Sequence, residues 1–242
     1  MSSGQRVLVI LGLLLGMRQV AAYPSLTGPT GTAVVPDAAI VAEETLNIAV
    51  DGCHTGGVTP ASVRALYGLT PDLEVGGGCG LHTGHARWTV QAKYASPVTI
   101  DQADLSAGVV FTCSSTDHAS SVQGYLVSTR AFSPGIAGVP ALHGSLGVNW
   151  TTVSGTRDAN AVRAFLSAVV DFHNGLAFCA EYQTRGLHDR HGVAAMTTRY
   201  LRQDGLAVEL GITNLDAVGD AAPHGLAVYG PFMGVACAII GR

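Results

Sequence analysis

Short runs of alternating apolar and polar residues, each closed by an aromatic residue just before a turn, constrain this chain more than any other feature. Alternation with a period of two is typical of β-strands that present one face to an apolar phase and the other to a polar one. Aromatic residues at one level of the strand ends are typical of the bilayer interface of a membrane β-barrel. The five candidate interface aromatics are Tyr67, Tyr94, Phe132, Phe172 and Tyr200.

The alternation recurs in about twelve segments from residue 45 onward. In one of them, Trp88, Val90 and Tyr94 share a face that excludes Thr89 and Lys93. The expected strands are 45–53, 61–68, 73–80, 86–94, 104–113, 121–132, 141–151, 161–172, 176–183, 192–200, 206–213 and 224–240. Together they predict an all-β fold, an antiparallel up-and-down transmembrane β-barrel of about 12 strands. Val110, Phe165 and Val169 are exceptions, because each places an apolar side chain in the polar series.

Compact turns separate several of these runs. Phe172 and Leu176 must share a face, which predicts a three-residue turn with Gly175 in the left-handed conformation. The turns that follow the aromatics are short, and we expect the connections at the opposite rim to be longer and more polar.

The residues before the barrel divide into two parts. Residues 1–22 are predicted to be a signal peptide, since Arg6 precedes a short apolar core and small residues end at Ala22. Residues 23–44 contain repeated Gly and Pro, and this N-terminal segment is expected either to plug the barrel or to cross its periplasmic mouth as a strap. Residues 45–242 form the expected barrel.

The composition favours lipid over water around the outer face. Charged residues make up 12% of the chain and apolar residues 48%, whereas a typical soluble domain has about a quarter charged residues. A soluble secreted ligand-binding β-barrel is the alternative, and it would place the apolar series inside instead.

The polar series carries six acids and five bases that are expected to face the lumen. These candidate pore-lining residues are Asp51, Arg64, Glu74, Arg87, Lys93, Asp104, Arg163, Asp171, Glu181, Arg199 and Glu209. One interpretation is a weakly cation-preferring pore whose charges set selectivity. The other, which we favour for most of these residues, is an interior filled by paired side chains.

Histidine and cysteine residues suggest two further hypotheses. His82, His85, His188 and His191 are expected in loops of the rim opposite the aromatics, where they form a speculative metal site; solvated polar loops are the simpler interpretation. The five cysteines lack metal-ligand spacing, and we interpret most of them as small hydrophobic residues on strand faces. Cys53 and Cys79 are the candidate pair if a single disulfide forms.

Several stretches of the chain resemble a known family. The N-terminal YPSLTGPTG of residues 23–31, followed by PDAA of residues 36–39, and the hairpin YGLTPDLEVG of residues 67–76 are similar to YjbH-type outer-membrane β-barrels of Gram-negative bacteria. Residues 202–210 resemble the same hairpin more loosely. The chain departs from that pattern after Gly31 and ends without a terminal aromatic residue. The resemblance implies an association with exopolysaccharide production or export.

The sequence therefore predicts an outer-membrane β-barrel, exported by a cleaved signal peptide. Its expected function is either a narrow, porin-like channel or a structural, accessory component of exopolysaccharide export. We expect no catalytic residues and no cofactor, since the chain lacks a nucleophile elbow, a phosphate loop and a zinc motif. The expected partners are outer-membrane lipid and, as a further option, polysaccharide or export-system proteins, without nucleic acid.

Overall fold

The chain forms twelve β-strands in a computed structural model. The structure describes residue 31 and residues 35–53, 61–82, 85–115, 120–133, 140–154, 159–172, 174–185, 192–202, 205–214 and 230–240. The strands are β1 (Thr45–Cys53), β2 (Ala61–Thr70), β3 (Leu73–His82), β4 (His85–Ala95), β5 (Ala103–Ser114), β6 (Ser120–Ser133), β7 (Ala141–Ser154), β8 (Ala159–Phe172), β9 (Leu176–Gln183), β10 (Val193–Leu201), β11 (Leu206–Thr213) and β12 (Gly230–Ile240).

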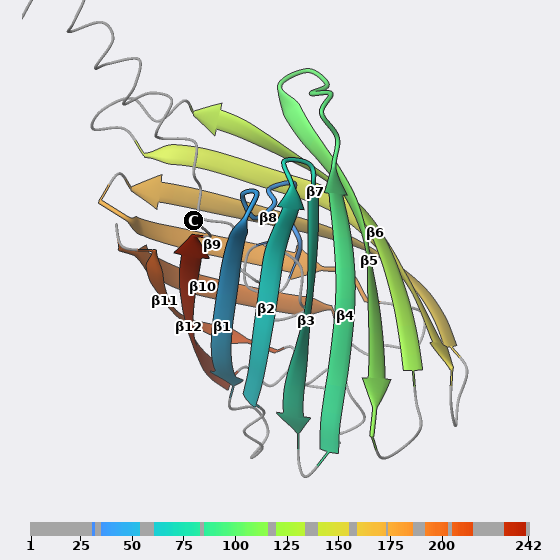
Figure 1. The fold of residues 1–242 in the computed structure, drawn as a ribbon. Helices are drawn as coiled ribbons and strands as arrows, with labels where there is room; N and C mark the ends of the chain where they lie inside the picture. The colour runs from blue at the N-terminus through green and yellow to red at the C-terminus, as the bar shows by residue number, and fades with distance from the viewer. Residues whose placement is uncertain are drawn as a thin grey trace, which may run out of the picture.

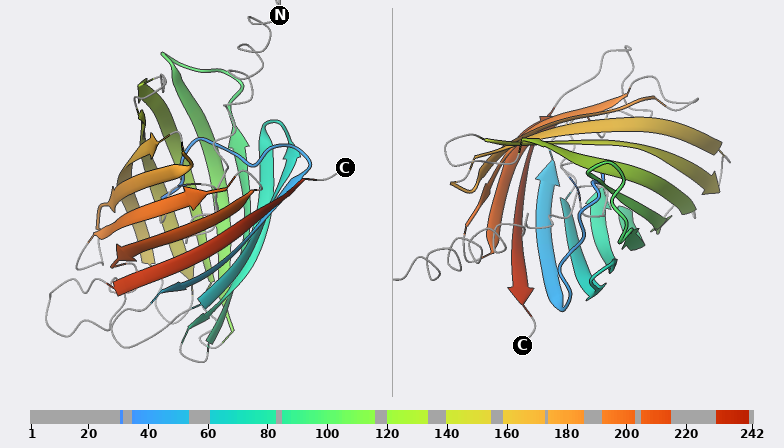
Figure 2. Two further views of the ribbon diagram at one scale, coloured as in Figure 1. Left: turned by 90° about the vertical axis from the view of Figure 1, so that its left-hand side faces the viewer. Right: turned by 90° about the horizontal axis from the view of Figure 1, so that it is seen from above.

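These strands form one closed antiparallel barrel in which each strand pairs with its neighbours in the chain (Figures 1 and 2). The first and last strands close it, with Thr45 opposite Ile240 and Cys53 opposite Phe232. Closure leaves no unpaired sheet edge, which a bilayer requires because lipid cannot hydrogen-bond a free edge. The predicted fold class is confirmed.

The outer face of the barrel carries the apolar series. Val90 and Leu146 in the middle of their strands are each more than 60% exposed. The alternate positions point inward and are mostly buried, as Gln91, Ser145 and Phe165 show. A soluble barrel would have the reverse arrangement, so the soluble alternative does not fit this fold. Among the described residues, no helix is long and apolar enough to cross a membrane.

The five predicted interface aromatics point outward at one end of the barrel, which we call the terminal rim because Thr45 and Ile240 also lie there. Four of them are exposed, and the ring of Phe172 packs edge-on against that of Phe178 at 5.8 Å. A second set, which the sequence interpretation missed, lies outward near the opposite rim. It consists of Trp88, Phe111, Trp150 and Tyr182. Two aromatic levels bound the apolar band, as in membrane barrels.

The turn between β8 and β9 has the predicted geometry. Phe172 pairs with Leu176, Gly175 has a φ of 85°, and its N–H donates to the carbonyl oxygen of Phe172 at 3.1 Å. Glycine adopts this left-handed conformation without the steric cost that other residues meet. The carbonyl of Gly175 also accepts a hydrogen bond from Leu201 at 2.7 Å, which ties the turn to β10.

The structure bears on three other expectations. Connection lengths do not separate the rims, because only residues 83–84 join β3 to β4 at the opposite rim. The candidate disulfide is wrong, since Cys79 is a free cysteine. The last strand begins at Gly230, and residues 224–229 of the expected segment lie outside the described part of the chain. Pro231 is its second residue, and it pairs with Ile212 of β11 but lies outside the pairing of β12 with β1, which starts at Phe232.

Candidate functional site in the lumen

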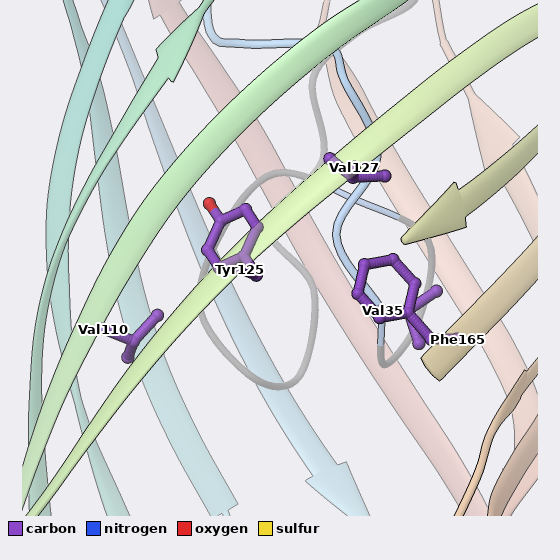
Figure 3. Close-up of a cluster of buried hydrophobic side chains, with 5 residues drawn as sticks. All are labelled: Val35, Val110, Tyr125, Val127 and Phe165. Atoms are coloured by element: carbon purple, nitrogen blue, oxygen red, sulfur yellow. The ribbon is translucent and has the colours of Figure 1, made fainter. Parts of the chain in front are cut away.

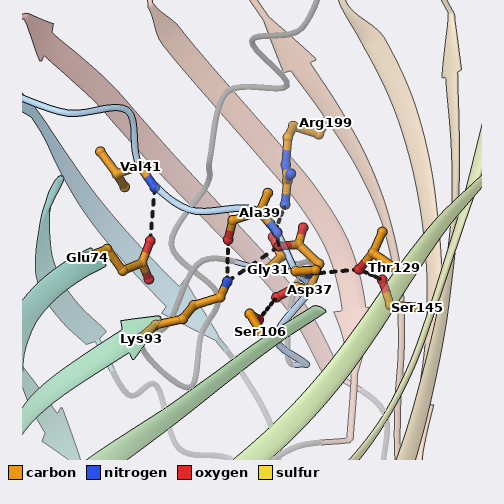
Figure 4. Close-up of polar contacts among 11 residues, drawn as sticks. Gly31, Asp37, Ala39, Val41, Glu74, Lys93, Ser106, Thr129, Ser145 and Arg199 are labelled. Atoms are coloured by element: carbon orange, nitrogen blue, oxygen red, sulfur yellow. Dashed lines mark hydrogen bonds and ion pairs between the residues drawn. The ribbon is translucent and has the colours of Figure 1, made fainter. Parts of the chain in front are cut away.

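The candidate site is the barrel interior together with a stretch of the N-terminal segment that lies inside it. We call this stretch, Gly31 and residues 35–44, the lumen segment. It has no regular secondary structure apart from isolated bridges, and its polar contacts reach strands on several sides of the barrel (Figure 4). Val35, Ala38 and Val41 are buried. Residues 23–30 and 32–34 lie outside the described part of the chain.

Two carboxylates hold the backbone of the lumen segment. Glu74 of β3 accepts a hydrogen bond from the N–H of Val41 at 3.0 Å, and Glu181 of β9 accepts one from Val35 at 2.9 Å. These strands are six places apart in a ring of twelve and so lie on opposite sides of the barrel. Both carboxylates are buried, where hydrogen bonds to charged groups are stronger than neutral ones.

Bases and hydroxyls complete this attachment. The Lys93 ammonium lies 3.6 Å from the Asp37 carboxylate and also donates to the carbonyl oxygen of Ala39. Arg199 donates to the carbonyl of Gly31 at 3.4 Å. On β6, the hydroxyl of Thr129 accepts from the N–H of Ala38 at 2.8 Å. Apart from the Gly31–Pro36 bridge, the backbone groups of the lumen segment named here therefore bond to the barrel wall, as buried backbone groups require.

A buried apolar cluster between the lumen segment and the wall contains two of the three exceptions to alternation. Val35 packs in a buried cluster with Val110, Tyr125, Val127 and Phe165, all on the inner face (Figure 3). The inward apolar positions noted at Val110 and Phe165 therefore belong to the buried cluster that contains Val35 of the segment. A similar, smaller contact joins Val41 to Leu66. The sequence pattern marked these exceptions but offered no partner for them.

A second group of predicted lumen residues pairs within the wall. Arg64 of β2 forms an ion pair and hydrogen bond with Asp51 of β1, and both side chains are nearly inaccessible. Arg199 and Glu209 lie 3.2 Å apart on β10 and β11, and Glu209 also accepts from Thr197 at 2.9 Å. Each pair joins adjacent strands, so these charges offset one another across the sheet.

The remaining four predicted lumen residues lie toward the ends of their strands. Arg87 and Asp104 belong to the inward series of β4 and β5 but are exposed toward the two rims. Arg163 is partly buried and donates to Thr151 at 3.4 Å. Asp171 is partly buried on β8. The structure thus gathers seven of the eleven residues around the buried interior and leaves four toward its ends.

Several buried polar atoms of the wall are unsatisfied with the segment in place. Among the described residues, both amide atoms of Gln91, the hydroxyl of Tyr125, Oδ1 of Asn149 and Oγ of Ser167 have no hydrogen-bond partner. All four side chains point inward from β4, β6, β7 and β8. Since a buried polar atom without a partner costs about 1–3 kcal/mol, this wall would gain by contact with water.

The structure does not bring the predicted histidine site together in its described part. His82 and His85 face each other across β3 and β4 in the backbone pairing, but their side chains, and His188 and His191 entirely, lie outside the described residues. Within the described residues, no three His, Cys, Asp or Glu side chains are placed to hold a metal ion.

Structural comparison relates the fold to outer-membrane porins. The chain superposes on the KdgM porin with a TM-score of 0.59 and 7% identity, over 79% of this chain and 98% of that one. It superposes on the NanC porin with a TM-score of 0.59 and 12% identity, over 78% and 98%. The outer membrane protein Omp33 of Acinetobacter baumannii gives 0.51 and 8%, over 81% and 99%. No family model matches the sequence. No curated protein matches it either.

Proposed function

We propose that this protein is a narrow outer-membrane channel for small hydrophilic solutes and that its lumen segment holds the channel closed. The observation that carries the proposal is the pair of wall carboxylates, Glu74 and Glu181, which bind the segment from opposite sides of the barrel. Water can replace hydrogen bonds of this kind when the segment moves, whereas it cannot replace the contacts of a continuous apolar core. The porin-like fold supports a channel.

The inner wall suits an open, hydrated state. Gln91, Tyr125, Asn149 and Ser167 have unpartnered polar atoms in the closed state and would line a water-filled path once the segment moved. The energetic gain of hydrating them offsets part of the free energy with which the wall binds the segment. The equilibrium between closed and open barrels is therefore expected to respond to small changes in the hydrogen bonds between segment and wall.

The wall charges favour neutral or cationic solutes. The inward series contributes six acids and five bases, which gives a weak preference for cations. One structural neighbour is the KdgM porin in complex with disordered oligogalacturonate. The inward strand positions of this barrel have no excess of positive charge. The solute that we propose is therefore not an acidic saccharide.

A structural role in exopolysaccharide export is the second candidate. The YjbH-type resemblance of residues 23–31 and 67–76 suggests it, and a lumen occupied by the chain itself favours a barrel that does not conduct. In that case the partners are export-system proteins or polysaccharide rather than a diffusing solute. Both candidates place the exported chain in the outer membrane.

Planar-bilayer recording of the refolded full chain separates the candidates. Glu74→Gln and Glu181→Gln keep the shape of the carboxylates but remove the charge from their hydrogen bonds. We expect each to raise the ratio of open to closed channels roughly fivefold, since about 1 kcal/mol separates charged from neutral hydrogen bonds. The wild-type barrel should open rarely.

Asp104→Asn is the control, because Asp104 belongs to the same inward series yet accepts a hydrogen bond from Thr99 of the β4–β5 connection rather than from the lumen segment. It should leave the opening frequency near that of the wild type. If the wild type and both glutamine variants, in barrels shown to be folded, conduct no current, the channel proposal is wrong and the accessory role is favoured.

A further inference from the structure

A hollow on the outer face near the terminal rim forms a candidate lipid site. It runs across β5, β6 and β7 in two connected parts of about 500 and 660 Å³, which share Ser128 and Leu146. We propose that it binds one glycerophospholipid with a phosphoethanolamine headgroup. The proposal depends on the membrane position of the barrel but not on whether the barrel conducts.

Small outward residues form the floor of the hollow, and large ones form its sides. Ala107, Ser128 and Gly144 leave the sheet surface low on three successive strands. Leu126, Leu146 and Val148 rise beside them, with Tyr94 and Phe132 toward the rim. A low floor between tall side chains gives a methylene chain close contact on several sides, and such contacts are individually weak but numerous.

The rim end of the hollow carries one charge of each sign. Arg130 of β6 lies 3.8 Å from Asp101, which belongs to the connection between β4 and β5. Their side chains are 44% and 89% exposed, so this pair remains open to a ligand. The guanidinium fits a phosphate, and the carboxylate beside it fits a primary ammonium that can donate hydrogen bonds.

This pair, rather than the apolar surface, would select the lipid. Lipid tails are as apolar as the groove, so within a bilayer the groove alone gives little preference for any occupant. A purely anionic headgroup would meet the Asp101 carboxylate, and a choline headgroup has no N–H to donate to it. The phosphoethanolamine headgroup satisfies both charges.

Native mass spectrometry of the micelle-solubilised full chain tests the site. The protein is mixed with equimolar phosphatidylethanolamine, phosphatidylcholine and phosphatidylglycerol of identical acyl chains, and the retained lipids are counted. We expect one phosphatidylethanolamine to be retained in preference to the others. Arg130→Gln and Asp101→Asn should each reduce that retention roughly two- to fivefold, as for an exposed ion pair. Ser128→Leu, which fills the floor and keeps both charges, should also reduce it.

Arg202→Gln is the control, since Arg202 is an exposed base in the β10–β11 connection of the same rim. It should retain the lipid like the wild type, and heat-modifiable gel mobility verifies that every variant is folded. Equal retention of all three lipids, preference for phosphatidylglycerol, a dimer without lipid, or retention unchanged in Arg130→Gln and Asp101→Asn would each overturn the proposal.

Discussion

At the scale of single residues, the stability of the barrel interior depends on buried charges that form ion pairs with one another. Arg64 and Asp51 are both nearly inaccessible, and they neutralise each other across β1 and β2. Removal of one member of such a pair leaves a buried charge without compensation, which costs more than the intact pair contributes. The number of charged residues on the inner face therefore says less about selectivity than their pairing does.

Arg64→Met should consequently destabilise the barrel by about 3–5 kcal/mol, because it leaves the Asp51 carboxylate uncompensated. The free energy of unfolding in urea, followed by Trp88 and Trp150 fluorescence in micelles, measures the effect. The double variant Asp51→Leu/Arg64→Met removes both charges and should recover most of the loss. Equal destabilisation of single and double variants would contradict this account of the pair.

Backbone conformation at one turn residue gives a second prediction. Gly175→Ala should lower the free energy of unfolding by about 1–2 kcal/mol or more, since a φ of 85° is unfavourable for alanine and its Cβ would meet the Leu201 carbonyl. Gly80→Ala is the control, because the nearest atoms to a Cβ there lie 3.8 Å away. Equal urea midpoints for the two variants would contradict this account of the turn.

At the scale of elements, each strand separates lipid from lumen by its alternation. The sequence pattern predicted eleven of the twelve strands to within three residues, because period-two alternation is a local property. It could not distinguish the inner from the outer face by itself. Exposure of the apolar face in a closed barrel, between aromatic residues near both rims, makes that distinction.

A charge placed on the outer face tests this orientation. Val90→Arg introduces a cation between the two aromatic levels of β4 and should destabilise the barrel by about 2–4 kcal/mol in a lipid bilayer. Val98→Arg is the control, since Val98 is similarly exposed but lies in the β4–β5 connection at the rim. Unfolding in lipid vesicles compares them. A Val90→Arg barrel as stable as the Val98→Arg barrel would indicate that this face does not meet hydrocarbon.

At the scale of the whole molecule, the contents of the lumen were the least predictable part. The lumen segment has no periodic pattern, and its partners come from strands as distant in sequence as β3 and β9. The sequence signals were the apolar residues that break alternation, and two of them, Val110 and Phe165, belong to the buried cluster that contains Val35. The candidate charges were identifiable as inward residues, whereas their role as attachments for the segment required the three-dimensional arrangement.

A reversible lock between the segment and the wall tests the central claim most directly. Ala38→Cys and Thr129→Cys join positions whose backbone N–H and hydroxyl lie 2.8 Å apart, in a background with the five native cysteines replaced by alanine. Single-channel current is recorded across one bilayer before and after a reductant is added. We predict silence while the disulfide is intact and openings after reduction, with the alanine background unchanged by reductant. Equal current in both states, with the disulfide verified by mass, would contradict closure by the lumen segment.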